Sequence, residues 1–302
     1  TRRFLREQCH SKTLRELESS DTGFSGALWN DMAAQGWTGI IVPERHGGSG
    51  LGLLELGVLL EEIGRAAFDS PFSANLMVTL AILGSGSGPR TQQLLSEIAG
   101  GGVIVAPAIE ELGVSYEPRF VTVRAERSAD AFILSGSKMF VPYADVVDHL
   151  LVLARTQGSI GDEGGCSLLL VDRRSPGIRM TRLDTIAPDR QFRIDFDQVV
   201  VAGEAVLGDA GAALRLLADV QRQCTALTCA EMLGGAEHQL EVTAEYVKQR
   251  VQFDRPIGSF QAVHHHLADM FTLVQASRWT TYQAIDQLQR NRPAEREVAI
   301  AK

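Results

Sequence analysis

The stretch KQRVQFDRPIGSFQAVHHH, residues 248–266, gathers one cation and two amides around a turn: Arg250, Gln252 and Gln261. A guanidinium can make charge-assisted, two-pronged hydrogen bonds to a phosphate, and carboxamides can serve the polar edges of a nucleotide. These residue types therefore fit the binding of a dinucleotide. Taken alone, an arginine and two glutamines at helix ends are better explained as solvated surface residues.

Three other stretches have residues typical of a phosphate-binding loop, a metal site or a serine hydrolase, but none has the structural context that such a site needs. HGGSGLG (46–52) lacks the lysine of a Walker motif and does not lie between a strand and a helix, so a tight turn is the simpler interpretation. Neighbouring residues on a helix point about 100° apart, so His264, His265 and His266 cannot converge on one ion, and we expect no metal site. LSGSK (134–138) lacks the strand-elbow-helix setting of a serine hydrolase.

The chain that must position these residues has 302 residues, enough for two or three modules. Its 45% hydrophobic and 22% charged residues are typical of a globular protein, and no apolar run approaches the roughly 20 residues that span a bilayer. The net charge of -8 argues against a nucleic-acid-binding surface. Four cysteines without C-x-x-C spacing indicate free thiols, so we expect a cytoplasmic protein.

Hydrophobic periodicity divides the chain into three regions and predicts an α+β multidomain fold. Residues 1–102 are helical in period, with apolar residues at spacings of three and four such as Leu53, Leu56, Leu60 and Ile63. Residues 103–208 are short β-rich runs without intervening helices, which favours a sandwich or barrel. Residues 209–302 return to a helical period and predict two long antiparallel helices of a bundle, joined by the turn near Arg250.

The last region has two further features. Gly234 and Gly235 lie inside a predicted helix, where each would cost about 1 kcal/mol relative to alanine, so we expect a close backbone contact there. The final residues, REVAIAK, look helical and have no cap or breaker. We therefore expect that the bundle is truncated and that further helices follow residue 302.

Three stretches, in this order and spacing, resemble the acyl-CoA dehydrogenase family: GWTGIIVPERHGGSGLGLLELGVLLEEIGRA (36–66), LSGSKMFVPYADVVDHLLVLART (134–156) and EYVKQRVQFDRPIGSFQAVHHHLADM (245–270). The third, with its Arg-x-x-Phe, Pro-Ile-Gly and Phe-Gln elements, is the most specific. The resemblance runs from about residue 24 to the end. It implies a helical domain, a middle β domain and a C-terminal four-helix bundle.

The resemblance also implies FAD as cofactor and a dimer or tetramer. In the family, the equivalents of four residues meet the FAD of a neighbouring subunit: Arg250, Gln252, Phe253 and Gln261. Cofactor binding and oligomerisation would then be coupled. Asp254 stands where the family usually has glycine, and its negative charge is unfavourable near a diphosphate unless it points away.

The expected flavin-ring side departs from the family. Trp-Ile-Thr is replaced by Phe140, Val141 and Pro142. Phe140 could still stack on the ring, but Pro142 has neither a hydroxyl nor an N–H to give flavin N5. In APAIEELG (106–113), Ile109 and Glu110 are expected ring contacts, and Glu110 places a carboxylate where a hydroxyl normally faces the flavin. Glu110 is thus a candidate acid or base, with a charge turned to solvent as the alternative.

The implied reaction needs a carboxylate that removes the α proton of an acyl-CoA while a β hydride passes to the flavin. Some members carry that glutamate, followed by a substrate-contacting arginine, where this chain has Cys224 and Thr225. Most members carry it in the last helices, so no base is identified here. Ser115 and Thr225 are candidate substrate contacts.

Three functions fit these residues. The first is an FAD-dependent acyl-CoA dehydrogenase of fatty-acid oxidation that passes electrons to an electron-transfer flavoprotein. The second is a cofactor-sharing partner of an unlike homologous subunit, as in some actinobacterial heteromers, which fits the departures at Glu110, Pro142, Cys224 and Thr225. The third is a flavin monooxygenase on the same fold, which the loss of the N5-facing hydroxyl permits.

Overall fold

The structure, a computed structural model, describes residues 1–86, 88–113, 115, 117–186 and 189–302. Its helices are α1 (Arg2–Gln8), α2 (Ser11–Ser19), α3 (Gly26–Ala34), α4 (Leu53–Arg65), α5 (Phe72–Gly84), α6 (Pro89–Ala99), α7 (Ala213–Gln249), α8 (Gln261–Gln289) and α9 (Glu295–Ala301). Its strands are β1 (Val105–Ala108), β2 (Arg124–Ser128), β3 (Ala131–Pro142), β4 (His149–Arg155), β5 (Cys166–Asp172), β6 (Ile178–Leu183), β7 (Gln191–Ala202), β8 (Val206–Leu207), β9 (Val251–Gln252) and β10 (Arg255–Pro256).

The described residues form two compact units, and neither is continuous in sequence. The helical unit comprises Thr1–Lys12, Leu51–Phe68 and Arg222–Lys302. The sheet unit comprises Thr13–Gly50 and Asp69–Gln221. The predicted α+β fold is confirmed, whereas the division of the sequence at residues 102/103 and 208/209 stays a prediction.

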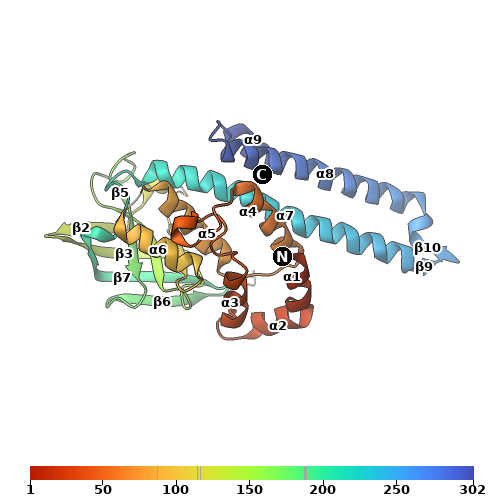
Figure 1. Cartoon of the computed structure of the whole chain (residues 1–302), viewed down its shortest axis with the longest axis horizontal. Coiled ribbons are helices and arrows are strands. Elements are labelled where there is room, and N and C mark those ends of the chain that lie inside the picture. The colour runs from red at the N-terminus through yellow and green to blue at the C-terminus, as the bar shows by residue number, and fades with distance from the viewer. Residues whose placement is uncertain (87, 114, 116, 187–188) are drawn as a thin grey trace. The chain divides into compact units, whose positions relative to one another are not determined.

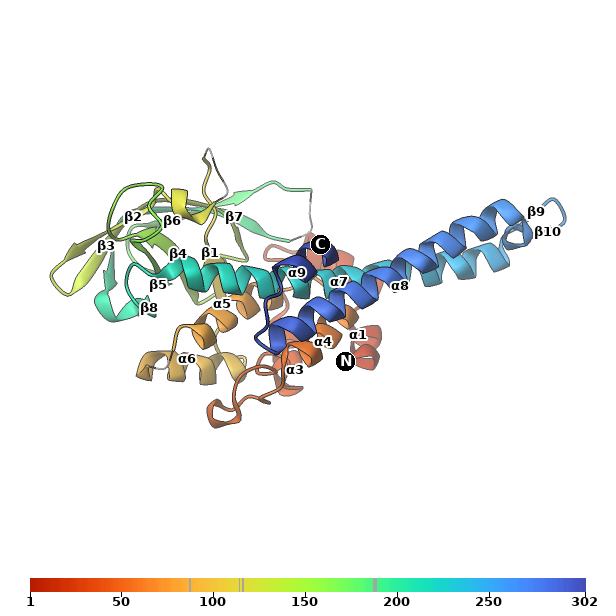
Figure 2. The same ribbon diagram turned by 90° about the horizontal axis from the view of Figure 1, so that it is seen from above.

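In the helical unit, the two long helices predicted from periodicity are present. α7 and α8 run side by side in opposite chain directions, and the β9–β10 turn joins their ends (Figures 1 and 2). Their inner faces bury apolar side chains, among them Leu233, Val247, Val274 and Ile285. Burial of such a stripe, rather than intrinsic helix propensity, supplies most of the stability of a helix in a folded protein.

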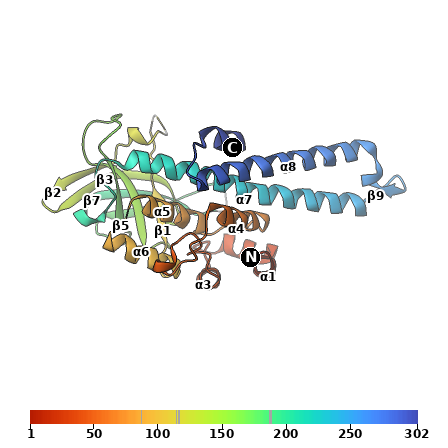
Figure 3. The same ribbon diagram turned by 45° about the horizontal axis from the view of Figure 1, so that its top comes forward.

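The predicted close contact at Gly234 is present where α7 crosses α4, two helices that lie next to each other in Figure 3. A methyl group added at Gly234 would lie 1.8 Å from the carbonyl oxygen of Glu61, and one added at Gly64 would lie 1.8 Å from that of Glu231. Only glycine fits at either position. A methyl group at Gly235 would meet nothing nearer than 3.5 Å, so the contact needs only the first glycine of the pair.

A buried carboxylate ties the same helices together. Glu61 of α4 is 6% exposed, and it accepts hydrogen bonds from Arg278 Nη1 at 2.8 Å and from the hydroxyl of Tyr282 at 2.6 Å, both on α8. Arg278 also pairs with Glu237 of α7 at 2.9 Å. Because a buried charge is tolerated only when it is paired and hydrogen-bonded, this network makes the packing of three helices specific.

The sheet unit is built on one mixed sheet with the strand order β6-β7-β3-β2-β4-β5-β8, and β1 pairs with β4 in parallel. In β7, Phe192, Ile194 and Phe196 are buried and alternate with more polar positions, as the sequence predicts for a strand with one buried face. Figure 2 shows α5 and α6 beside these strands. α5 is anchored to β1 because Asn75 Oδ1 accepts a hydrogen bond from Val105 N at 2.8 Å.

The described residues contain neither a membrane-spanning helix nor a cluster of metal-ligating side chains. No helix among them is both long and apolar enough to cross a membrane. No group of three or more His, Cys, Asp or Glu side chains in that part of the chain is arranged to hold a metal ion.

Candidate functional site

A β-bulge in β3 turns Phe140 away from the interior of the sheet unit. Along β3 the even-numbered positions Phe132, Leu134 and Lys138 are buried, so regular alternation would bury residue 140 as well. Between Lys138 and Val141 the strand inserts one extra residue relative to β7, and the register changes. Val141 becomes fully buried, while Phe140 has a φ of +54° and is 48% exposed.

The conformation next to this bulge is held by several contacts. Pro142 pairs with Gln191 of β7, and Tyr143, which has a φ of +52°, is 2% exposed. The hydroxyl of Tyr143 donates to Asp69 Oδ2 at 2.6 Å, and burial followed by the nearby carboxylates holds the pKa of Tyr143 above its usual value. Non-glycine residues at positive φ cost about 1–3 kcal/mol and persist where the surroundings impose them, which is common at functional sites.

The segment after β1 runs beside the bulge and borders a cavity. Met139 N donates to the carbonyl oxygen of Glu110 at 2.9 Å. The cavity has a volume of about 570 Å³ and mainly apolar walls, and its lining includes Ile109, Glu110, Glu111, Ser115, Glu117, Phe120, Val121 and Ile160. A volume of this size suits part of a cofactor or a small ligand. The structure thus brings three of the predicted site residues, Ile109, Glu110 and Ser115, to one cavity.

Glu111 and Lys138 form a buried ion pair behind the cavity. Lys138 Nζ donates to Glu111 Oε1 at 2.7 Å and to the carbonyl oxygen of Ile109 at 2.8 Å, and Lys138 is 0% exposed. Burial lowers the pKa of Lys138 to about 8. Burial alone would raise the pKa of Glu111, but the charge and hydrogen bond of Lys138, with bonds from Thr122, bring it below the usual value. This pair fixes the segment that carries Glu110.

Glu110 is in different surroundings from its neighbour. It is half-buried, and burial raises the pKa of its carboxyl group above the usual value, with Lys138 opposing this rise and Glu111 adding to it. A carboxyl group with a raised pKa keeps its proton to a higher pH than a solvated glutamate does. Both sequence-based interpretations, an acid or base and a charge turned to solvent, stay predictions, because the half-buried side chain lines the cavity and is still partly exposed.

Arg155 holds the two loops that border the cavity. It is 1% exposed, and its guanidinium donates to the carbonyl oxygens of Gly164 and Arg119, with a longer contact of 3.5 Å to that of Gln157. These carbonyl groups belong to the β4–β5 loop and to the short helical turn at Pro118–Phe120. The positions of Phe120 and Ile160 in the cavity wall therefore depend on one buried cation.

The turn that carries Arg250 is a tight hairpin in the helical unit. β9 pairs with β10 through Gln252 and Arg255, so Phe253 and Asp254 form a two-residue loop with φ values of +52° and +63°. Such a loop requires positive φ at both central residues, where asparagine and glycine are favoured. The glycine that the resemblance implies for position 254 would meet this requirement with less strain than Asp254 does.

The predicted cofactor contacts at this turn are all on the surface. Arg250, Gln252, Phe253 and Gln261 are exposed, and Phe253 is 86% exposed. The turn itself is well ordered by local contacts, because Phe260 packs edge-on against Phe253 and lies 4.1 Å below the guanidinium of Arg255. The backbone N–H and C=O of Arg250 bond to Tyr246 and Ile257, but no hydrogen bond or ion pair within the described part of the chain involves its guanidinium, which is left to solvent or to another molecule.

Cys224 and Thr225 lie half-buried on α7. Burial raises the pKa of the Cys224 thiol to about 12, so the thiol is not ionised near neutral pH. Cys224 therefore cannot replace a catalytic carboxylate as a base. The role of Thr225 as a substrate contact stays a prediction.

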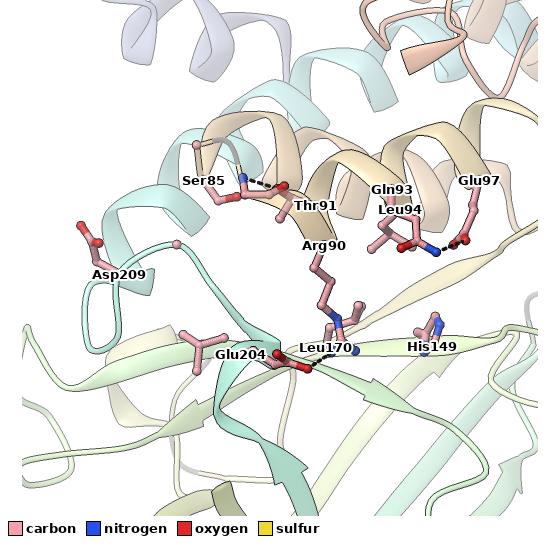
Figure 4. Close-up of a pocket in the computed structure, with 14 residues that line it drawn as sticks. Ser85, Arg90, Thr91, Gln93, Leu94, Glu97, His149, Leu170, Glu204 and Asp209 are labelled. Carbon is pink, nitrogen blue, oxygen red and sulfur yellow. Dashed lines mark hydrogen bonds and ion pairs between the residues drawn. The ribbon is translucent and has the colours of Figure 1, made fainter. Parts of the chain in front are cut away.

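A second cavity, of about 810 Å³, lies between α6 and the sheet (Figure 4). Arg90 reaches from α6 toward Glu204, and their closest charged atoms are 3.7 Å apart. His149 and Leu170 lie on the strands below Arg90 (Figure 4). This cavity shares no lining residue with the one at Glu110, and it contains none of the residues predicted from the sequence.

Comparison with known proteins decides the family. Models of the N-terminal, middle and C-terminal domains of acyl-CoA dehydrogenases match residues 1–102, 107–199 and 214–302. A solved structure described as a Tcur3481-Tcur3483 steroid ACAD G363A variant shares 33% sequence identity with a TM-score of 0.86, covering 100% of this chain and 79% of that one. The chain belongs to the acyl-CoA dehydrogenase family. Members of this family are oxidoreductases, and their flavoprotein character implies a flavin cofactor.

Other members of the acyl-CoA dehydrogenase family cover most of this chain. The mitochondrial 2-methylacyl-CoA dehydrogenase of Solanum tuberosum is 30% identical over 84% of this chain, which spans only 63% of that protein. FadE27 of Mycobacterium tuberculosis is 29% identical over 96% of this chain and 74% of its own length. The ChsE4-ChsE5 complex from Mycobacterium tuberculosis has a TM-score of 0.87 at 28% identity, covering 99% of this chain and 78% of that one.

Sequence reasoning missed the buried pair formed by Lys138 and Glu111. A signal was present, because Lys138 falls in phase with the inward positions Phe132 and Leu134 of its strand. A charged residue at an inward strand position predicts a buried partner. The identity of that partner, 27 residues earlier in the chain, depends on how β1 is placed beside β3.

Proposed function

We propose that this chain belongs to an FAD-dependent dehydrogenase that oxidises an acyl-CoA thioester between Cα and Cβ and acts in the cytoplasm. The observation that carries the proposal is the bulge in β3, which exposes the ring of Phe140 directly after Met139, whose backbone N–H donates to the carbonyl oxygen of Glu110 at 2.9 Å. An exposed aromatic ring held at positive φ is a rigid stacking surface for a planar ring system. Electrons would leave to an electron-transfer flavoprotein, and the pathway would be fatty-acid oxidation.

The residues of the sheet unit fit the ring of a flavin. Phe140 would stack on it, Ile109 would supply apolar surroundings, and Glu110 would face its polar edge. Val141, whose side chain is fully buried, would offer only its backbone. Bound there, the flavin would accept the hydride that leaves the thioester. Pro142 cannot donate a hydrogen bond from its nitrogen, so the ring loses a donor that related chains have. Ser115, at the cavity wall, would contact the substrate through its hydroxyl.

The exposed turn of the helical unit would serve the other half of the cofactor. Arg250 would pair with the diphosphate, while Gln252, Phe253 and Gln261 would contact the nucleotide of a neighbouring subunit. Support comes from the surface of the hairpin, which exposes an unusual number of large apolar side chains: Met232, Val242, Tyr246, Phe253, Phe271, Leu273 and Trp279. Such a surface is typical of a protein interface, so we propose a dimer or tetramer.

A heteromer is the second candidate. Two of the similar solved structures are described as pairs of differently named chains, ChsE4-ChsE5 and Tcur3481-Tcur3483. The unreactive thiol of Cys224 fits a chain that does not supply the catalytic base. In this arrangement the chain would bind FAD together with an unlike homologous subunit. A flavin monooxygenase is a third candidate, which the missing donor at Pro142 favours.

The test starts with the visible spectrum of the purified protein and the identity of any released cofactor. A yellow protein that contains FAD and is bleached anaerobically by an acyl-CoA supports the dehydrogenase. Bleaching only after an unlike subunit is added supports the heteromer, and oxygen consumption with reduced flavin supports the monooxygenase. A colourless protein that does not bind added FAD contradicts all three.

A further inference from the structure

Two consecutive glutamates in the cavity region have opposite surroundings. Glu111 uses both carboxylate oxygens: Oε1 accepts from Lys138 Nζ at 2.7 Å and from Val123 N at 3.1 Å, and Oε2 accepts from Thr122 N at 2.8 Å. Glu110 lines the cavity, and its carboxyl group has no hydrogen-bond partner among the residues that the structure describes. Only Glu110 is therefore available to a bound ligand.

The local balance of charge favours a neutral Glu110. Lys138 is fully buried and already neutralised by Glu111, so an ionised Glu110 would be an unpaired negative charge beside apolar walls. The charged groups that face it are Lys138 from β3, Glu111 from its own segment and, elsewhere in the cavity lining, Glu117. Glu111 disfavours a further carboxylate and Lys138 opposes this effect, while Glu117 is paired with Arg119 at 2.8 Å; the largest influence on Glu110 is burial.

We propose that Glu110 carries a proton in the flavin-bound protein and donates a hydrogen bond from its carboxyl group to an acceptor atom of the flavin ring. The inference rests on the proposed function, because it requires the ring to lie against Phe140. Glu111 and Lys138 act as a positioning pair, since they fix the segment through Ile109 and Thr122. Burial, which raises the pKa of Glu110, is consistent with this assignment.

Two neighbouring carboxyl groups can have different pKa values because their surroundings differ, and this difference assigns a role to each. The group held by a cation stays ionised, and the group in an apolar cavity keeps its proton. A protonated carboxyl group offers the ring a donor, and an ionised one offers only a repelling charge. The electronic spectrum of the bound ring must therefore change when Glu110 titrates.

The experiment follows the visible absorbance of the flavin-bound protein as a function of pH. Wild type is expected to show an inflection above the usual range of a glutamate. Glu110→Gln keeps an N–H donor and cannot ionise, so its spectrum should lack this inflection. Glu117→Gln is the matched control, because Glu117 lines the same cavity but pairs with Arg119 at 2.8 Å, and this variant should keep the inflection.

A second measurement keeps the proposal testable if Glu110→Gln fails to fold. Infrared difference spectra of the wild type, recorded on flavin reduction at neutral pH, should contain a carboxylic-acid C=O band, which Glu110→Asp should shift. Absence of that band, or an inflection that survives in Glu110→Gln, overturns the proposal. A protein that binds no flavin contradicts the proposed function instead, so the two failures are distinguishable.

Discussion

The crossing of α4 and α7 allows a sharp test with two neighbouring glycines. In Gly234→Ala the new methyl group would lie 1.8 Å from Glu61 O and 2.8 Å from Arg65 N, and both are backbone atoms that cannot rotate away. Overpacking of this kind costs about 1–3 kcal/mol, and contact with backbone places it at the upper end. The gain in helix propensity, about 1 kcal/mol, offsets part of that cost. The expected net loss of stability is about 2 kcal/mol.

Gly235→Ala is the matched control, because it adds the same methyl group to the same helix. Its nearest neighbour, Gly64 O, would be 3.5 Å away, which is an ordinary contact. This variant should gain up to about 1 kcal/mol from helix propensity. The two single variants should therefore differ by about 3 kcal/mol although they are adjacent in sequence.

Equilibrium urea unfolding, followed by circular dichroism and fitted for midpoint and slope, measures this difference. The transition that reports the helical unit should move to lower urea in Gly234→Ala and slightly to higher urea in Gly235→Ala, with unchanged slopes. Equal stabilities of the two variants would refute the reasoning, because helix propensity alone treats both positions alike. A slope that changes would mean that the variant altered the folded or unfolded ensemble instead.

Three further predictions concern the turn, the buried pair and pH. Because residue 254 needs positive φ, Asp254→Gly should raise the free energy of unfolding by about 0.5 kcal/mol, and Asp254→Val should lower it by more than about 1 kcal/mol. Thermal unfolding measures both variants, and the reverse order of stabilities would argue against the loop geometry. Lys138→Met leaves Glu111 unpaired and should lower the free energy of unfolding, measured in urea, by about 3–5 kcal/mol. The double variant Lys138→Met, Glu111→Gln should recover part of this loss, and no recovery would mean that the two side chains are not coupled. Burial raises the pKa of Asp69 from 3.8 to about 6, so the folded state binds the proton more tightly than the unfolded state does. The contribution of Asp69 to the free energy of unfolding should therefore be greatest below pH 3.8 and should fall by about 3 kcal/mol as the pH rises through 6. Asp69→Asn should remove that pH dependence from the unfolding midpoint, and an unchanged profile would contradict the assignment.

The helices and strands were predictable where one face of a regular element is buried. Phe192, Ile194 and Phe196 follow the period of a strand, and the apolar residues of α7 and α8 follow that of a helix. Gly234 could also be interpreted correctly, because a glycine that weakens a helix needs a compensating contact. The angle at which α4 crosses α7 decides which of the two adjacent glycines makes that contact. This angle cannot be predicted from the sequence of α7 alone.

The candidate site was less accessible to sequence reasoning. Phe140 is in phase with the buried residues of β3, and only the bulge at Lys138–Val141 turns it outward. A bulge changes the register by one residue without a distinctive local sequence, so counting along the strand gives the wrong face. The assignments of Arg250, Gln252, Phe253 and Gln261 to a cofactor depend on a second molecule, and they stay predictions.

Arg155 makes its hydrogen bonds to carbonyl groups, which every amino acid possesses. Apart from Gly158 and Gly161, which have positive φ, the side chains between Gln157 and Gly164 can therefore change without loss of these bonds, provided that the number of residues in the loop is kept. Substitutions at Ile160 would reshape the cavity wall while the anchoring bonds remain, so the shape of the cavity can change without loss of the fold. An insertion or deletion in the same loop would displace Gly164 and deprive a buried guanidinium of one of its acceptors.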